Sequence, residues 1–207
     1  MTRRPTLVAV SGPPGAGKTT LLTRALATAL GWPAVSRDEI KEQIAAAGAD
    51  PADPAVDLRT RDAFFCAIGE LVRSGTSLAA EAAFQDRLWR PALEPLADLA
   101  DIRVVRCAVD PALARVRISR RAAEEPSRAV HADADLLRRI AEGEQPIESW
   151  VPIALDVPCL VVDTAHDWEP PLARITEFAT HDAASAAGDQ SVRTSRARPR
   201  TDPGSGR

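Results

Sequence analysis

The amino-acid sequence predicts an α/β fold, with a single parallel sheet of five strands and helices on both faces. Short apolar segments typical of buried strands alternate along the 207 residues with longer segments of helical periodicity. A glycine-rich turn directly follows the first of these strands and leads into the first helix. A chain of this length suits one domain. We expect this domain to span residues 1–183 and residues 184–207 to form a disordered tail.

The first two pairs of strand and helix follow from local signals. Residues 7–11 are an apolar run that ends at a glycine, as expected for a buried strand. The helix after the glycine-rich turn is expected over residues 18–30. A short second strand over residues 33–36 leads into a helix over residues 37–48, so Asp38 lies at a junction between strand and helix.

The middle of the chain predicts a long helix and a third strand. Two prolines mark residues 49–56 as a loop, and Asp57 can cap a helix over residues 58–74. The third strand is expected over residues 77–83, and a helix over residues 86–99 follows it.

The last part of the chain continues the alternation. Residues 102–109 are rich in β-branched side chains and predict the fourth strand. An arginine-rich helix is expected over residues 112–124, and the polar segment 125–132 after it is expected to be mobile. Asp133 can cap the next helix. The remaining elements are a helix over residues 133–143, a strand over residues 160–162 and a helix over residues 171–180.

The glycine-rich turn carries the strongest functional signal. It fits the pattern G-x-x-x-x-G-K-[ST] without a gap, between a strand and a helix as a phosphate-binding P-loop requires. Its glycines let backbone amides turn inward around a polyphosphate. Lys18 can reach the β and γ phosphates, and Thr19 can ligate Mg²⁺. The sequence therefore predicts the P-loop NTPase fold. The residues expected to hold the triphosphate are Gly12, Pro13, Pro14, Gly15, Ala16, Gly17, Lys18, Thr19 and Thr20.

Acidic residues lie at or near the carboxyl ends of three predicted strands, where ligands bind in parallel sheets. They are Asp38, Glu81 and Asp110. Asp38 is a candidate base for an acceptor hydroxyl, although an Asp at this place can also serve only as a helix cap. Glu81 interrupts an apolar run, and a buried carboxylate is costly unless it meets a cation, metal-bound water or an acceptor. The second protein contact to Mg²⁺ stays open between Glu81 and Asp38.

Basic residues near this edge of the sheet are candidates for binding the acceptor and the triphosphate. Lys41 lies one helical turn after Asp38 and can hold the acceptor or orient that carboxylate. Arg87 can clamp an anionic acceptor or be an ordinary surface charge. Arg117 and Arg121 share one helix face, and they fit either a lid that closes over the γ phosphate or a solvated basic helix.

The composition limits the partners of the chain. Its net charge is −3, but from residue 184 onward five arginines stand against two aspartates. This tail has little apolar content and predicts disorder, with arginines that are either solvated or touch nucleic acid. The acidic remainder argues against a polynucleotide partner.

Cysteine usage and hydropathy indicate the compartment. Cys66, Cys107 and Cys159 lie far apart within apolar stretches, which predicts buried thiols in a reducing compartment. No apolar segment approaches the roughly 18 residues of a membrane-spanning helix, and the N-terminus shows no signal peptide. We therefore expect a cytoplasmic protein without membrane insertion.

Six segments carry a family resemblance when they are taken in order: GPPGAGKTT, VSRDEIKE, EAAF, RISRR, HADADLL and DVPCLVVDTAHDWEP. Over residues 5–180 the chain resembles the P-loop kinase family typified by the kinase domain of phage polynucleotide kinase. Many bacterial members are known as AAA-family ATPases or predicted kinases. Chloramphenicol phosphotransferase and zeta toxin are more distant relatives.

The resemblance implies roles for individual residues. Asp38 is similar in position to the base of the family's D-x-x-R segment, whose arginine is replaced here by Lys41. This replacement weakens a bidentate grip on a phosphate and argues against a 3′-phosphorylated polynucleotide as acceptor. The two arginines of the predicted lid correspond to lid arginines of the family. Residues 163–165 resemble its adenine-contacting segment, so Thr164 is expected to bind the nucleotide.

Taken together, the sequence predicts a kinase that uses ATP and Mg²⁺ and phosphorylates a hydroxyl of a small molecule. A regulatory ATPase or switch and a kinase acting on a 5′-hydroxyl nucleic-acid end are the alternatives. An AAA+ motor is disfavoured because the sequence shows neither an appended helical bundle nor a clean Walker B segment. A GTPase is disfavoured because the N-K-x-D motif is absent.

Overall fold

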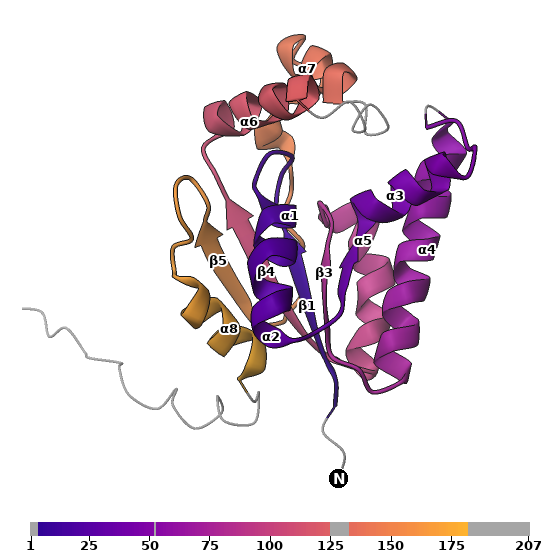
Figure 1. Cartoon of the computed structure of the whole chain (residues 1–207), viewed down its shortest axis with the longest axis vertical. Helices are drawn as coiled ribbons and strands as arrows, with labels where there is room; N and C mark the ends of the chain where they lie inside the picture. Colours follow the sequence, from indigo (N-terminus) through magenta and orange to yellow (C-terminus); the bar gives the residue numbers. More distant parts are fainter. Residues whose placement is uncertain (1–3, 52, 125–132, 182–207) are drawn as a thin grey trace, which may run out of the picture.

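The structure is a computed structural model that describes residues 4–51, 53–124 and 133–181. It confirms the predicted α/β fold (Figure 1). One sheet of five strands has the order β2-β3-β1-β4-β5, and every neighbouring pair is parallel. The strands are β1 (Thr6–Ser11), β2 (Ala34–Ser36), β3 (Leu78–Glu81), β4 (Asp101–Ala108) and β5 (Cys159–Asp163).

Helices connect the strands and cover both faces of the sheet. The helix after β1 and α8 lie on one side, and α4 and α5 lie on the other (Figure 1). The helical elements are α1 (Lys18–Leu21), η1 (Leu22–Leu26), α2 (Ala27–Leu30), α3 (Arg37–Ala46), α4 (Pro54–Arg73), α5 (Asp86–Leu93), η2 (Glu94–Asp98), α6 (Pro111–Glu124), α7 (Asp133–Ala141), η4 (Ile147–Ser149) and α8 (Leu172–Thr180).

The central strand β1 shows why the sheet needs two helical layers. Successive side chains of a strand point to opposite faces, and here both sets are apolar. Leu7 and Ala9 pack into the core cluster formed with α4 and α5. Val8 and Val10 pack into the cluster formed with η1 and α8. A strand buried on both faces is typical of parallel sheets.

Helices α6 and α7 form a separate unit beyond the carboxyl ends of the strands (Figure 1). Their own small core contains the buried Ala114 and Ile118 of α6 and Ile147 of η4. The partly buried Leu136 and Leu137 of α7 pack against it. This unit is therefore placed above the edge at which the P-loop lies.

The start of α4 differs from the sequence prediction. The helix begins at Pro54, and Asp53 caps it by accepting a hydrogen bond from the Ala55 N–H at 2.9 Å. Proline suits the first helical position because that N–H has no partner in the helix. The prediction of Asp57 as the cap is therefore wrong, and this residue lies inside α4.

Two other helices depart from regular α geometry. The helix predicted over residues 18–30 contains a π-helical turn, η1. The helix predicted over residues 86–99 changes into the 3₁₀ helix η2 at Glu94. Pro95 at this point has no N–H to continue the α-helical hydrogen bonds.

The cysteines are all free, but only one is buried. Cys107 lies in the core, where burial raises the pKa of its thiol to about 12. The prediction of three buried thiols is wrong for Cys66 and Cys159, which are exposed. Cys159 lies on β5, the strand at one end of the sheet order.

Three further expectations concern the rest of the chain. Among the described helices, none has both the length and the apolar character needed to cross a membrane. The segment 125–132, predicted to be mobile, lies outside the described residues, and so does the tail 184–207, predicted to be disordered.

Candidate functional site

The P-loop joins β1 to α1 at the carboxyl edge of the sheet (Figure 1). Gly15 and Gly17 have φ angles of 76° and 74°, left-handed values that glycine adopts at little cost. Gly17 is also the N-cap of α1, and the first N–H groups of a helix have no partner within it. The loop and the helix start therefore form a cradle of backbone donors suited to an anion.

The P-loop is anchored to α6. A Cβ atom at Gly15 would lie only 2.6 Å from the carbonyl oxygen of Ala114, so no larger side chain fits there without a shift of backbone. Arg117 donates to the Gly15 carbonyl oxygen at 3.4 Å and to the carbonyl oxygens of Thr164 and Ala165, the last at 2.9 Å. The Arg117 guanidinium thereby ties the P-loop to the loop after β5.

Thr164, in the loop after β5, also holds the P-loop in place. Its hydroxyl oxygen is buried and lies 3.0 Å from the carbonyl oxygen of Ala16 and 3.1 Å from that of Ala108. The residue predicted to bind the nucleotide thus also holds the loop that would bind the phosphates.

Glu81 ends β3 and is only 2 % exposed. Its Oε1 atom accepts hydrogen bonds from the Ser36 hydroxyl at 2.6 Å and the Thr19 hydroxyl at 3.1 Å. Burial raises the pKa of Glu81; the Lys18 ammonium opposes this shift, and the Asp38 carboxylate adds to it. Thr19, the predicted Mg²⁺ ligand, and Glu81, one of the two candidates for the second protein contact to Mg²⁺, are therefore in direct contact.

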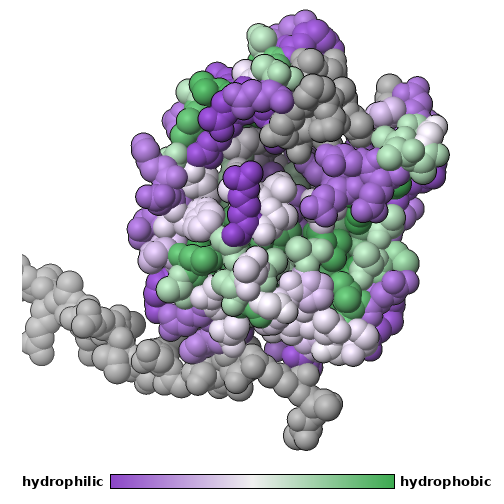
Figure 2. Space-filling view, in the orientation of Figure 1, coloured by the Kyte–Doolittle hydropathy of each residue, from purple (hydrophilic) through white to green (hydrophobic). Residues whose placement is uncertain are grey.

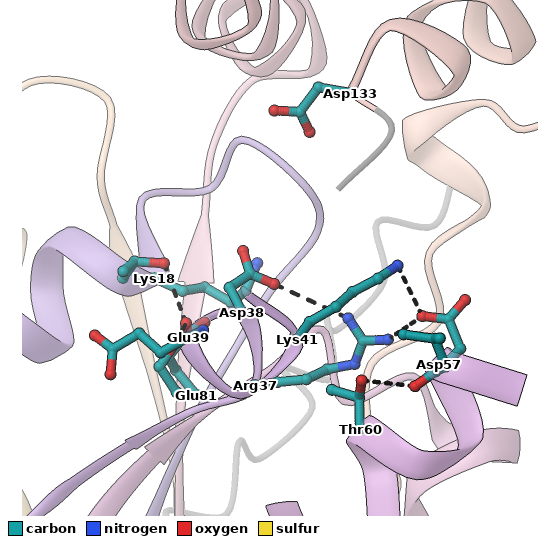
Figure 3. A network of polar contacts seen from close by, with 12 residues as sticks. Lys18, Arg37, Asp38, Glu39, Lys41, Asp57, Thr60, Glu81 and Asp133 are labelled. Carbon is teal, nitrogen blue, oxygen red and sulfur yellow. Dashed lines mark hydrogen bonds and ion pairs between the residues drawn. The ribbon is translucent and has the colours of Figure 1, made fainter. Parts of the chain in front are cut away.

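Asp38 lies in the first turn of α3, and Ser36 is the N-cap of that helix. The Ser36 hydroxyl accepts the hydrogen bond from the Glu39 N–H at 3.4 Å. The Asp38 carboxylate lies 3.9 Å from the Arg37 guanidinium. Figure 3 shows Asp38 and Glu81 at the same edge of the sheet as Lys18.

Lys41 is buried on α3, and its ammonium nitrogen lies 3.0 Å from Oδ1 of Asp57 on α4. Arg37 donates to the same oxygen at 2.7 Å (Figure 3). Partial burial alone would raise the pKa of Asp57, but the hydrogen bonds and charges of Lys41 and Arg37 outweigh it and lower the pKa. Asp57 therefore neutralises part of the charge of Arg37 and Lys41. These two cations lie on α3, and the side of the site that they form is called the α3 wall below.

Arg121 is held by a carboxylate of α7. Its Nε and Nη2 atoms donate to the two carboxylate oxygens of Asp133 at 2.9 and 2.8 Å, a bidentate pair. Asp133 is 5 % exposed. The two arginines of the predicted lid thus lie on one helix with different partners, backbone carbonyls for Arg117 and a carboxylate for Arg121.

Two cavities meet at the P-loop, on a face where hydrophilic side chains gather over α3 and α6 (Figure 2). The first cavity, of about 500 Å³, extends toward α3 and α5, and its lining includes Lys18, Thr19, Asp38, Lys41, Glu81 and Asp133. The second cavity, of about 440 Å³, lies between α6 and the loop after β5, and its lining includes Arg117, Arg120, Thr164, His166 and Trp168. The residues that line both are Gly15, Gly17, Thr20, Arg24 and Arg121.

The sequence singled out most of this lining but not all of it. Arg87, predicted to bind an acceptor, is exposed on α5 and lines neither cavity. Sequence reasoning missed Arg24, Asp57 as a partner of Lys41, and Asp133 as a partner of Arg121. No motif marks Arg24, and an aspartate near a helix start is indistinguishable in sequence from a cap.

Fold and loop together define the class of protein. A parallel sheet whose central strand ends in the P-loop is the P-loop NTPase fold, as the sequence predicted. Residues 7–144 match the model of the AAA domain family, and the chain belongs to this family. The match and the kinase-like fold confirm the predicted relation to P-loop kinases.

Solved structures share the fold over most of the chain. A presumed kinase from Chloroflexus aurantiacus J-10-fl is 26 % identical, with a TM-score of 0.70 over 85 % of this chain and 97 % of that one. A sugar kinase from Janibacter sp. HTCC2649 is 18 % identical, with a TM-score of 0.55 over 84 % of this chain and 92 % of that one.

A third similar structure comes from the Pnkp1/Rnl/Hen1 RNA repair complex. It is 20 % identical, with a TM-score of 0.53 over 75 % of this chain and 50 % of that one. At these identities the sugar kinase and the repair complex show the fold alone. No curated protein matches this chain.

Proposed function

We propose that the protein is a kinase that transfers the γ-phosphoryl group of Mg-ATP to a hydroxyl of a small-molecule acceptor. The observation that carries the proposal is the first cavity, which Lys18, Thr19 and Asp38 line together. Phosphoryl transfer needs a triphosphate cradle and a group that orients or deprotonates the acceptor. The similarity to the presumed kinase of C. aurantiacus supports the same class.

Each residue has a role in this proposal. The P-loop amides and Lys18 bind the β and γ phosphates, because positive charge fixed in a water-poor site stabilises the transferring group. The Lys18 ammonium already lies on the loop, 3.1 Å from the Pro13 carbonyl oxygen. Asp38 accepts the proton of the acceptor hydroxyl.

The donor set at Thr19 and Glu81 fits Mg²⁺, which prefers hard oxygen ligands. A hydroxyl and a carboxylate oxygen 3.1 Å apart face each other there. Glu81 is a better partner for the metal than Asp38 because it contacts Thr19 directly, and phosphates and water would complete the shell. Mg²⁺ would supply charge neutralisation at the β and γ phosphates.

The α3 wall favours an uncharged acceptor. Arg37 and Lys41 both bind Asp57, so an anionic group of an acceptor would have to compete with that carboxylate. The apolar Leu88 and Trp89 line the same cavity. A hydroxyl compound with one apolar face, such as a sugar, fits this mixture.

The test measures ADP release from Mg-ATP with and without acceptors. The panel contains sugars, nucleosides, aminoglycosides and a 5′-hydroxyl oligonucleotide. We expect stimulation by a small-molecule acceptor. Lys18→Ala should cut turnover by roughly two or more orders of magnitude. Asp38→Asn should slow transfer about 10²- to 10⁴-fold and leave Mg-ATP affinity within about a few-fold.

The alternatives predict other outcomes of the same assay. ADP release that no acceptor stimulates would indicate a regulatory ATPase. Stimulation by the oligonucleotide alone would indicate a nucleic-acid-end kinase. Undiminished turnover in a folded Lys18→Ala variant would refute the proposal.

A further inference from the structure

Arg24 lies where the two cavities meet. Five residues line both cavities, and only Arg24 and Arg121 among them carry a charge. Arg121 is bound to Asp133. Within residues 4–51, 53–124 and 133–181, Arg24 makes neither a hydrogen bond nor an ion pair.

Other basic side chains of the site are already engaged. Arg117 donates to backbone carbonyls, and Arg37 and Lys41 share Asp57. In the described structure, Arg24 therefore differs from these cations because its guanidinium can bind a ligand without first breaking an internal contact.

An unusual helical turn carries Arg24. The π-helical turn Leu22–Leu26 lies between α1 and α2, directly after the P-loop helix start. A π turn contains more residues than an α turn, so it changes the direction in which later side chains point relative to Lys18. Leu22 and Leu26 stay buried, whereas Arg24 is exposed.

The direction of the helix favours a contact with the P-loop side. Side chains of a helix lean toward its N-terminus, and the N-terminus of this helix is the P-loop. Figure 2 shows a strongly hydrophilic patch over this helix between paler side chains.

We infer that Arg24 binds the polyphosphate of the nucleotide where it passes from the first cavity into the second. The inference rests on the proposed function, because it takes Mg-ATP as the ligand. A guanidinium can donate to two phosphate oxygens in one plane. In the proposed function Lys18 binds the β and γ phosphates, and Arg24 lies further along the same helix, where it lines both cavities. This position assigns Arg24 to the α and β phosphates.

The test is calorimetric titration of the full chain with Mg-ATP and with ADP. Arg24→Ala should weaken binding of both nucleotides about 10- to 100-fold, as expected for hydrogen bonds to a charged group. Arg24→Lys should recover only part of the lost nucleotide affinity, because lysine lacks the planar guanidinium with its two parallel donors. Arg59→Ala is the matched control, since Arg59 is exposed on α4, lines neither cavity and should bind as the wild type does.

Each outcome separates the inference from the proposed function. If Arg24→Ala unfolds at the same temperature as the wild type, its loss of nucleotide affinity is an effect on binding and not on folding. Wild-type affinities in Arg24→Ala, together with weak binding in Lys18→Ala, would overturn the inference and leave the proposed function intact. Loss for ATP but not for ADP would overturn the assignment to the α and β phosphates. A wild-type protein that binds neither nucleotide would refute both.

Discussion

The two halves of the site, one proposed to bind the nucleotide and the other proposed to bind the acceptor, are built from different interactions. Around the P-loop, Gly15 packs on the backbone of α6, and Arg117 donates to backbone carbonyls. On the acceptor side, Asp57 holds Arg37 and Lys41 through ion pairs. Backbone partners do not depend on which side chains surround them, whereas an ion pair changes with either residue. Specificity can therefore vary in the acceptor half while the nucleotide half stays intact.

The largest expected effect comes from Arg117→Ala, which breaks the nucleotide half. The substitution removes the donor to three carbonyl oxygens. We expect a loss of about 2–4 kcal/mol in the free energy of unfolding, because each unsatisfied buried group costs about 1–3 kcal/mol. Nucleotide affinity should fall as well. Urea denaturation and calorimetric titration measure the two effects.

Arg120→Ala is the control for that change. Arg120 lies on the same helix, but it is exposed and pairs only with Glu124 at 3.8 Å among the described residues. Its removal should change stability by less than about 1 kcal/mol. Equal stability of the two variants would show that the contacts of Arg117 with the backbone carbonyls do not stabilise the fold.

Glu81→Gln tests the residue between the two halves. Burial raises the pKa of Glu81 above its ordinary value of 4.5. Between that value and the folded pKa, the folded protein holds a proton on Glu81 that the unfolded chain has released. Without nucleotide, stability should therefore fall as pH rises from about 4.5 through the folded pKa. Glu81→Gln should remove this slope and raise Tm at neutral pH by about 2–4 °C.

Thermal unfolding between about pH 4 and pH 8 checks the Glu81 prediction. The same variant should weaken Mg-ATP binding and leave magnesium-free ATP binding unchanged, if Glu81 contributes to the metal site. A variant with the wild-type pH profile would show that Glu81 does not cause the slope.

Among these variants, Asp57→Asn should have the smallest effect on stability. It tests whether the acceptor half can be changed without an effect on the nucleotide half. The pKa of Asp57 is lowered, so its contribution to stability is present above about pH 4 and lost as pH falls through the folded pKa. The substitution should therefore make the free energy of unfolding less dependent on pH in this acid range. It should also raise the KM for the acceptor, because Arg37 and Lys41 lose their shared partner, while Mg-ATP affinity stays unchanged.

Asp62→Asn on the same helix is the control, since Asp62 is exposed and pairs with Arg61 at 3.5 Å. Steady-state kinetics for both substrates separates the two effects. A loss of Mg-ATP affinity as large as the loss for the acceptor would show that the halves are coupled.

The parts predicted from sequence are those with local causes. The order of strand, P-loop and helix is written in consecutive residues, and the rule that ligands gather at strand ends brought Asp38 and Glu81 to one edge. The start of α4 was missed because Pro54 was interpreted as a loop signal, although proline also suits a first helical turn. Helical periodicity put Arg117 and Arg121 on one face but could not show their different partners. Those partners come from tertiary packing.

One oxygen atom of Glu81 links three distant positions of the sequence. Thr19 in the P-loop helix and Ser36 before α3 both donate to it, and Ser36 also caps the helix that carries Asp38. A change at any one of these positions would therefore disturb the contacts of the other two. Replacing Ser36 would remove a cap and a partner of the buried carboxylate in a single step. New acceptor preferences can therefore arise more easily from changes at the exposed positions of α3, such as Glu39 and Gln43, than from changes at Ser36 itself.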